Sequence, residues 1–120
     1  MAEHRYTIRE RRRQLKSLAK SLRALIPTVA ANPEFSDRTP LYQVALDETE
    51  RLLQQGFVQE DLSNLAKSIP DLFFRHKEWM PPVEETDDGK SVQPEWFVKL
   101  ESRLVPVLRN AMILRELGYY

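Results

Sequence analysis

Apolar residues recur at intervals of three and four along almost the whole chain, and this spacing constrains the fold more than any other feature. Such intervals place side chains on one face of an α-helix. No segment alternates apolar and polar residues over the length that a half-buried strand needs. The chain has 120 residues, of which 42% are hydrophobic. It is therefore predicted to form one all-α domain, residues 1–120, as a compact bundle of about five helices.

Capping signals and prolines predict where the first helix begins and ends. Thr7 and Glu10 have the spacing of a capping box, so a helix is expected to begin there. Pro27 marks its end or a kink, because proline cannot donate a backbone hydrogen bond. The first helix is therefore placed at roughly 7–27. Its inner face is predicted to consist of Ile8, Leu15, Leu18, Ala19, Leu22, Leu25 and Ile26.

Two further helices are expected in the middle of the chain. Thr39-Pro40 predicts an N-cap followed by proline in the first turn, and Gly56 followed by Phe57 resembles a Schellman close. The inner face of this second helix is expected to consist of Leu41, Val44, Ala45, Leu52 and Leu53. A third helix is expected from about Gln59 to Ser68. Its predicted inner face is Leu62, Leu65, Ala66 and Ile69.

Prolines divide the C-terminal half of the chain. Pro70 is expected to open a fourth helix over 71–79, and residues 81–93 are expected to form an exposed, acidic loop. The last helix should begin after Pro94 and bend or split near Pro106, which lacks a backbone donor. Its inner face is predicted to consist of Phe97, Leu100, Leu104, Val107, Leu108, Ala111 and Leu114 or Leu117.

Charge divides the chain into two opposed parts, although its net charge is zero. Residues 1–26 carry a net charge of +6, and the rest of the chain carries −6. An asymmetry of this kind suggests an anionic partner. That partner can be a nucleic acid, a membrane surface, or an acidic face of this protein or of another.

Six basic residues share one face of the first predicted helix at 100° per residue. They are Arg9, Arg12, Arg13, Lys16, Lys20 and Arg23. Charge runs are more often solvated or internally paired than ligand-binding, so a solvated or internally paired face is the favoured interpretation and polyanion binding is the alternative. The carboxylates available for pairing are Asp47, Glu48, Glu50, Glu60 and Asp61. A polyanion site requires that Arg9, Arg13, Lys16 and Lys20 are exposed together and unpaired.

The first helix carries two further features beside this stripe. Arg11 points toward the apolar face, where it is expected to extend outward or to pair with a carboxylate from another helix. A third face is small and nearly uncharged, and it consists of Gln14, Ser17, Ser21 and Ala24. Short side chains allow close approach either of another helix or of a phosphate backbone.

Aromatic residues cluster on both sides of the predicted acidic loop. They are Phe73, Phe74, Trp79, Trp96 and Phe97. Residues of this kind dominate either protein cores or interface hot spots. Core packing is the favoured interpretation, and an interface formed by Phe74, Trp79 and Trp96 is the alternative.

The sequence offers no catalytic constellation. There is no cysteine, no nucleophile motif and no glycine cluster for phosphate, and His4 and His76 lack metal-ligand spacing. Residues 84–95 match a calcium loop at only three positions, so Asp88-Gly89 is expected to be a turn in a solvated loop. No catalytic residue, metal, cofactor or small-molecule ligand is therefore predicted.

These observations favour a non-enzymatic interaction or regulatory module that acts through helical surfaces, either as a homodimer or with another protein. The first alternative is a nucleic-acid-associated protein that uses the basic face of its N-terminal helix. The second is a small enzyme whose carboxylate and histidine groups are assembled by the fold. Neither a transmembrane segment nor a secretory signal is predicted, and the absence of cysteines fits a reducing compartment, so a cytoplasmic location is expected.

Overall fold

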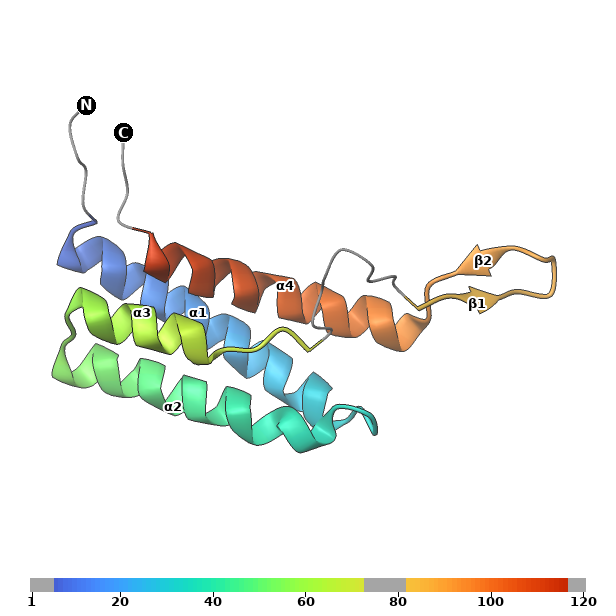
Figure 1. The fold of residues 1–120 in the computed structure, drawn as a ribbon, viewed down its shortest axis with the longest axis horizontal. Helices are drawn as coiled ribbons and strands as arrows, with labels where there is room; N and C mark the ends of the chain where they lie inside the picture. Colours follow the sequence, from blue (N-terminus) through green and yellow to red (C-terminus); the bar gives the residue numbers. More distant parts are fainter. Residues whose placement is uncertain (1–5, 73–81, 117–120) are drawn as a thin grey trace, which may run out of the picture.

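Four α-helices pack side by side in the computed structural model, which describes residues 6–72 and 82–116 (Figure 1). The elements are α1 (Ile8–Ala30), a 3₁₀ turn (Ser36–Arg38), α2 (Thr39–Gln55), α3 (Gln59–Ser68), β1 (Glu84–Glu85), β2 (Ser91–Val92) and α4 (Glu95–Arg115). The chain is thus mostly helical, in agreement with the predicted all-α class. Residues 73–79 of the predicted fourth helix lie outside the described residues.

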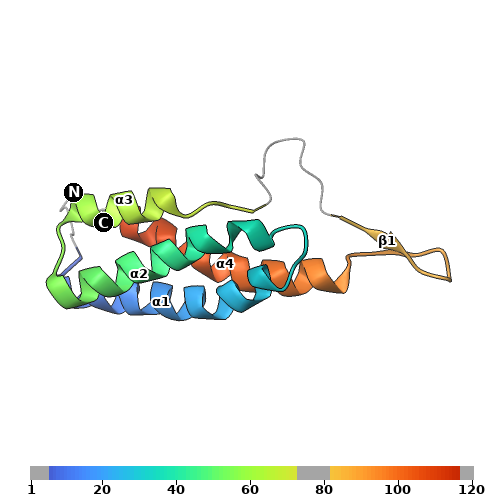
Figure 2. The same ribbon diagram turned by 90° about the horizontal axis from the view of Figure 1, so that it is seen from below.

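Successive helices run in opposite directions, and α4 returns to pack against α1 (Figure 1 and Figure 2). Each helix therefore contacts its two neighbours in the order α1, α2, α3, α4 around a shared core. α3 is much shorter than the other helices, whereas α1 and α4 extend along the whole bundle. The surface formed by α1 and α4 together is consequently the longest one that two neighbouring helices provide.

α1 begins where the sequence predicts and ends one turn later. The Thr7 hydroxyl accepts from the backbone N–H of Glu10 at 3.1 Å, and the Glu10 carboxylate accepts from that of Thr7 at 3.0 Å. This confirms the capping box. The helix continues past Pro27 because the next turn buries Val29 completely. Ile8, predicted to face inward, is exposed, since Arg11 takes the inward position in the first turn.

The core face of α2 overlaps the predicted one in part: Ala45 and Leu52 are buried as predicted, and Leu53 packs against the core. Leu41 and Val44 are exposed, and the core face consists of Tyr42, Ala45, Leu46, Thr49 and Leu52. Two of these residues are polar, so an apolar pattern misses them. The Tyr42 hydroxyl donates to the Pro70 carbonyl at 2.7 Å, and the Thr49 hydroxyl donates to that of Ala45 at 2.7 Å. Both buried hydroxyls are thereby satisfied.

The end of α2 also differs from the expected motif. Gly56 ends the helix with φ of 91° and ψ of 172°, and its N–H donates to the Leu52 carbonyl at 2.9 Å. A Schellman close requires the left-handed helical region, so that prediction is wrong. The observed conformation is one that glycine adopts and other residues avoid.

α3 and α4 follow the predictions closely. α3 has the predicted bounds, and its predicted inner face is buried. α4 continues through Pro106 as one helix, so of the two expected outcomes, a bend or a split, the split does not occur. The buried residues Leu104 and Val107 on either side hold the helix to the core. No helix in the described ranges is both long enough and apolar enough to cross a membrane.

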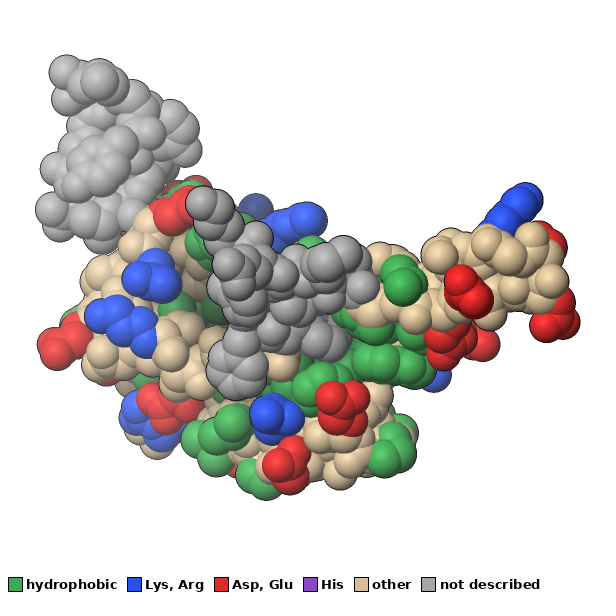
Figure 3. All heavy atoms as spheres, turned by 45° about the vertical axis from the view of Figure 1, so that its right-hand side comes forward, with side chains coloured by type: hydrophobic (Ala, Val, Ile, Leu, Met, Phe, Trp, Pro, Cys, Tyr) green, Lys and Arg blue, Asp and Glu red, His purple; other side chains and the backbone are tan. Residues whose placement is uncertain are grey.

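The predicted acidic loop contains a β-hairpin, which corrects the expectation that no strand forms. β1 and β2 pair antiparallel, with Glu84 opposite Val92. The turn is closed by Gly89, at φ of 79°, whose N–H donates to the Thr86 carbonyl at 2.9 Å. Local hydrogen bonds rather than apolar burial hold these short strands, so no alternating pattern marks them. The hairpin projects beyond the bundle and carries acidic side chains (Figure 1 and Figure 3).

Candidate functional site

The six residues of the predicted basic stripe divide into two groups. Two of them join α1 to α2: Arg12 Nη1 donates to the Leu53 carbonyl at 2.8 Å, and Arg23 Nη2 lies 2.7 Å from Glu50 Oε1. The other four are exposed and form no ion pair with any described residue. These four residues, Arg9, Arg13, Lys16 and Lys20, form what we call the outer basic face.

Three of the five carboxylates that were expected to neutralise α1 are engaged elsewhere. Glu48 is bonded by Arg51 in the same helix, which lowers the pKa of that carboxyl. Asp47 accepts from the Gln43 amide at 3.0 Å, and Asp61 accepts from the backbone N–H at the start of α3. Among the described residues, only Glu50 forms an ion pair with α1. Internal pairing therefore leaves the outer basic face free.

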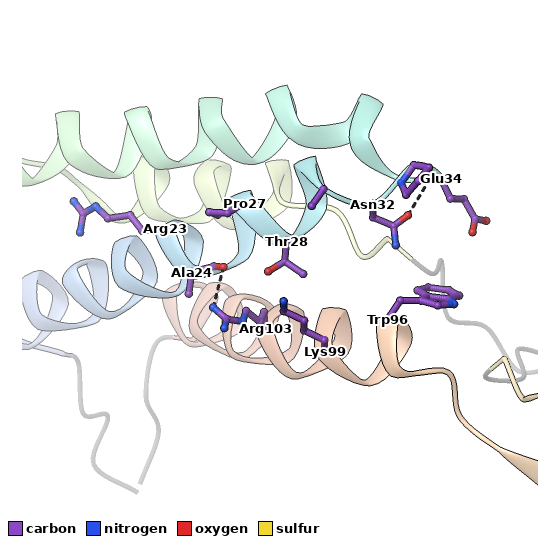
Figure 4. A pocket seen from close by; sticks show the side chains of 11 residues that line it. Arg23, Ala24, Pro27, Thr28, Asn32, Glu34, Trp96, Lys99 and Arg103 are labelled. Carbon is purple, nitrogen blue, oxygen red and sulfur yellow. Dashed lines mark hydrogen bonds between the residues drawn. The ribbon is translucent and has the colours of Figure 1, made fainter.

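α4 packs on the small face of α1, where the sequence allows close approach. The Asn110 amide donates to the Ser21 hydroxyl at 3.2 Å and to the Ser17 carbonyl at 3.3 Å. A groove of about 690 Å³ opens further along this contact, between the C-terminal half of α1 and the N-terminal half of α4 (Figure 4). This pairing brings basic residues of α4 to the side of α1.

Three cations and one tryptophan line this groove. Arg23 lies toward one end and Trp96 toward the other, with Lys99 and Arg103 between them (Figure 4). Arg103 is held by donating to the Ala24 carbonyl at 3.3 Å, whereas Lys99 has no ion-pair partner among the described residues. Glu34 is the one carboxylate among the described lining residues, and they include no histidine or cysteine.

Trp96 presents part of its indole ring to solvent. The residue is 39% exposed, and its ring meets that of buried Phe97 edge to face, with centroids 6.0 Å apart. Trp96, Lys99 and Arg103 follow the spacing i, i+3, i+7, which places them on one face of α4. This spacing is visible in the sequence, but the three residues line a groove only because α1 lies beside that face of α4.

A second groove, of about 460 Å³, continues along the seam between α1 and α4. Its lining includes Lys20, Ser21, Ser102 and Asn110. Ala24 and Arg103 line both grooves, so the two form one track along the seam. Because Lys20 also belongs to the outer basic face, that face and the track are continuous.

Arg11 lies inside the bundle rather than on its surface, which corrects both expectations for it. Its guanidinium donates to the Ile113 and Glu116 carbonyls at the end of α4, and to the side-chain oxygens of Gln14 and Gln59. A cation at this position also opposes the negative end of the α4 dipole. Burial lowers the pKa of Arg11, and Tyr6, Glu116 and Glu10 oppose that shift. Arg11 is therefore a structural residue.

Several predicted site residues lie where the structure gives no account of them. Phe74 and Trp79 of the predicted interface, and both histidines, are outside the described residues; Trp96 alone is placed. Within residues 6–72 and 82–116, no three acidic or histidine side chains converge to hold a metal ion. In the hairpin, Asp88 accepts from the Thr86 hydroxyl, which lowers the pKa of that carboxyl.

No protein-family model, curated protein or solved structure matches this chain.

Proposed function

We propose that this protein is a non-enzymatic binding module that engages nucleic acid through the outer basic face. The observation that carries the proposal is that Arg9, Arg13, Lys16 and Lys20 are exposed side by side without an ion pair among the described residues. A polyanion site requires this arrangement: the four cations must be exposed together and unpaired.

The spacing of these four cations suits a chain of phosphates. They lie three or four residues apart, so neighbouring side chains start about 5–6 Å from each other. Together they cover about 16 Å of the helix axis. Each phosphate that a cation neutralises releases condensed counterions, and this release favours binding most at low salt.

The zero net charge of the chain shapes the expected binding. There is no overall positive field to attract a polyanion, so attraction depends on the local separation of charge. Arginine and lysine contacts to phosphate carry no base sequence information. We therefore expect binding that is sequence-independent and falls steeply as salt rises.

A membrane surface fits this face less well. Interfacial helices insert an apolar face into the lipid, whereas the apolar face of α1 is buried in the bundle core. A protein partner that binds the aromatic residues remains the alternative. Its predicted interface includes Phe74 and Trp79, which lie outside the described residues.

Fluorescence anisotropy with a labelled single-stranded oligonucleotide, and with a duplex of equal length, tests the proposal across a salt series. The informative variant is Lys16→Glu/Lys20→Glu. Its matched control is Lys67→Glu/Lys90→Glu, which changes the net charge equally but alters α3 and the hairpin. Far-ultraviolet circular dichroism and urea unfolding verify that both variants fold.

We expect the wild-type protein and the control to bind alike, and the Lys16→Glu/Lys20→Glu variant to bind at least about tenfold more weakly. Four phosphate contacts predict a slope of log K against log salt near −3 for a single strand that contacts the outer basic face alone, and a shallower slope for the variant. The proposal is wrong if the wild-type protein does not bind at low salt. It is also wrong if the two variants lose affinity equally.

A further inference from the structure

Resting on the proposed function, we infer that the seam between α1 and α4 is a site for single-stranded nucleic acid, in which an unpaired base stacks on Trp96 and phosphates lie along Lys99 and Arg103. The outer basic face alone does not distinguish single strands from duplexes. The seam adds a partly exposed aromatic ring and a concave track, neither of which a phosphate contact requires.

The chemistry of the groove fits this ligand. Proteins that hold single strands combine a positively charged groove, which follows the backbone, with aromatic side chains on which bases stack. Here Trp96 lies toward one end of a groove of about 690 Å³, and Lys99 and Arg103 follow it on the same face of α4 (Figure 4). Lys99 and Arg103 are separated by about 6 Å along the helix axis, one helical turn.

Rigid placement of these groups supports a preformed site. The edge-to-face contact with Phe97, which is fully buried, holds the Trp96 ring against α4. The bond from Arg103 to the Ala24 carbonyl holds its guanidinium between the two helices while leaving other N–H groups for a phosphate. A ligand therefore meets two groups, Trp96 and Arg103, that lose little conformational freedom on binding.

The path of the strand follows from the two grooves. Ala24 and Arg103 line both, so a strand that begins at Trp96 can continue past Arg103 toward Lys20. In the second groove the Ser21 and Ser102 hydroxyls and the Asn110 amide already donate within the protein, so Lys20 is the group that meets a phosphate beyond Arg103. At Lys20 the strand reaches the outer basic face.

The test compares Trp96→Ala with Trp96→Phe, which keeps an aromatic face, and with Met112→Ala, a truncation at an exposed position of α4. Each variant is titrated with a labelled oligothymidine, with an abasic oligonucleotide of equal length and charge, and with a duplex. We expect Trp96→Ala to weaken oligothymidine binding about tenfold, as loss of one stacked base predicts. Trp96→Phe should lose less, and Met112→Ala nothing.

Two further results separate stacking from a general loss of structure. The salt slope should stay the same in Trp96→Ala, since no charge is lost, and should become shallower by about 0.7 in Lys99→Ala. Binding of the abasic oligonucleotide should be equal in the wild-type protein and in Trp96→Ala.

The inference is overturned if Trp96→Ala binds oligothymidine like the wild-type protein, or if it loses the same affinity for the abasic strand. In either case, a loss of binding in Lys16→Glu/Lys20→Glu would leave the proposed function standing. If the wild-type protein binds neither single strands nor duplexes at low salt, both proposals fail.

Discussion

Arg11 and Arg13 lie two positions apart on α1, yet the fold gives them opposite environments. Arg11 is buried and donates to two carbonyls and two amide oxygens, whereas Arg13 is exposed and has no ion pair among the described residues. A rotation of 200° about the helix axis separates them. The comparison teaches that a run of arginines can stabilise the fold with one face and remain available to a ligand with the other.

The largest expected difference between these environments is in stability. Arg11→Ala removes a charged donor from four acceptors at the meeting point of α1, α3 and α4, so it should lower the free energy of unfolding by about 3 kcal/mol. Arg13→Ala should change that free energy by less than about 0.5 kcal/mol. Urea denaturation of both variants measures the difference. Equal values would show that burial of Arg11 does not contribute to stability.

Tyr42 extends the comparison to a buried polar group at another place in the bundle. Tyr42→Phe removes the bond to the Pro70 carbonyl and should lower the free energy of unfolding by about 1 kcal/mol at neutral pH. Thermal or urea unfolding near pH 7 gives this value. No loss would mean that the phenol is held by packing alone.

Burial also raises the pKa of Tyr42 above its ordinary value of 10.0. Above pH 10 the unfolded chain therefore releases a proton that the folded chain retains. The free energy of unfolding then falls as pH rises, by up to about 1.4 kcal/mol per pH unit from this group. In Tyr42→Phe this contribution should be absent, so the alkaline slope should be less steep than in the wild-type protein. If the free energy of unfolding fell equally steeply with pH in both proteins, Tyr42 would not be the group responsible.

The smallest effect on stability is expected for an ion pair whose side chains are partly exposed. Arg23 and Glu50 are paired, but their side chains are 58% and 43% exposed. A double-mutant cycle with Arg23→Ala and Glu50→Ala should give a coupling energy below about 1 kcal/mol, and this coupling should decrease with added salt. A larger coupling energy that does not depend on salt would mean that this pair stabilises the fold as the buried Arg11 does.

Two predictions that depend on local chemistry were accurate, although the Schellman close and the hairpin were not predicted correctly. The capping box at Thr7 and the bounds of α3 depend on residues within a few positions of each other, and the structure confirms them. The inner face of α2 was predicted only in part, because Tyr42 and Thr49 enter the core as hydroxyl-bearing residues while Leu41 and Val44 are exposed. The Tyr42 hydroxyl donates to the Pro70 carbonyl, which is distant in sequence, and the spacing of apolar residues does not predict such a contact.

The candidate site shows the same division. The sequence placed six cations on one face of a helix, since 100° per residue is a property of the helix itself. It did not show that Arg12 and Arg23 would bond to α2, or that Lys99 and Arg103 of α4 would come to lie beside α1. Those outcomes depend on which helices become neighbours.

By itself, then, the sequence determined the helical class, most helix ends and the alignment of the outer basic face, because caps, periodicity and charge order act within one helix. Only the tertiary structure decided that Arg11 is buried, that the α2 carboxylates mostly bond elsewhere, and that Trp96 joins a groove between two helices distant in sequence. The physical reason is that burial, ion pairing and grooves arise from pairs of surfaces, and the packing of the whole chain decides which surfaces meet.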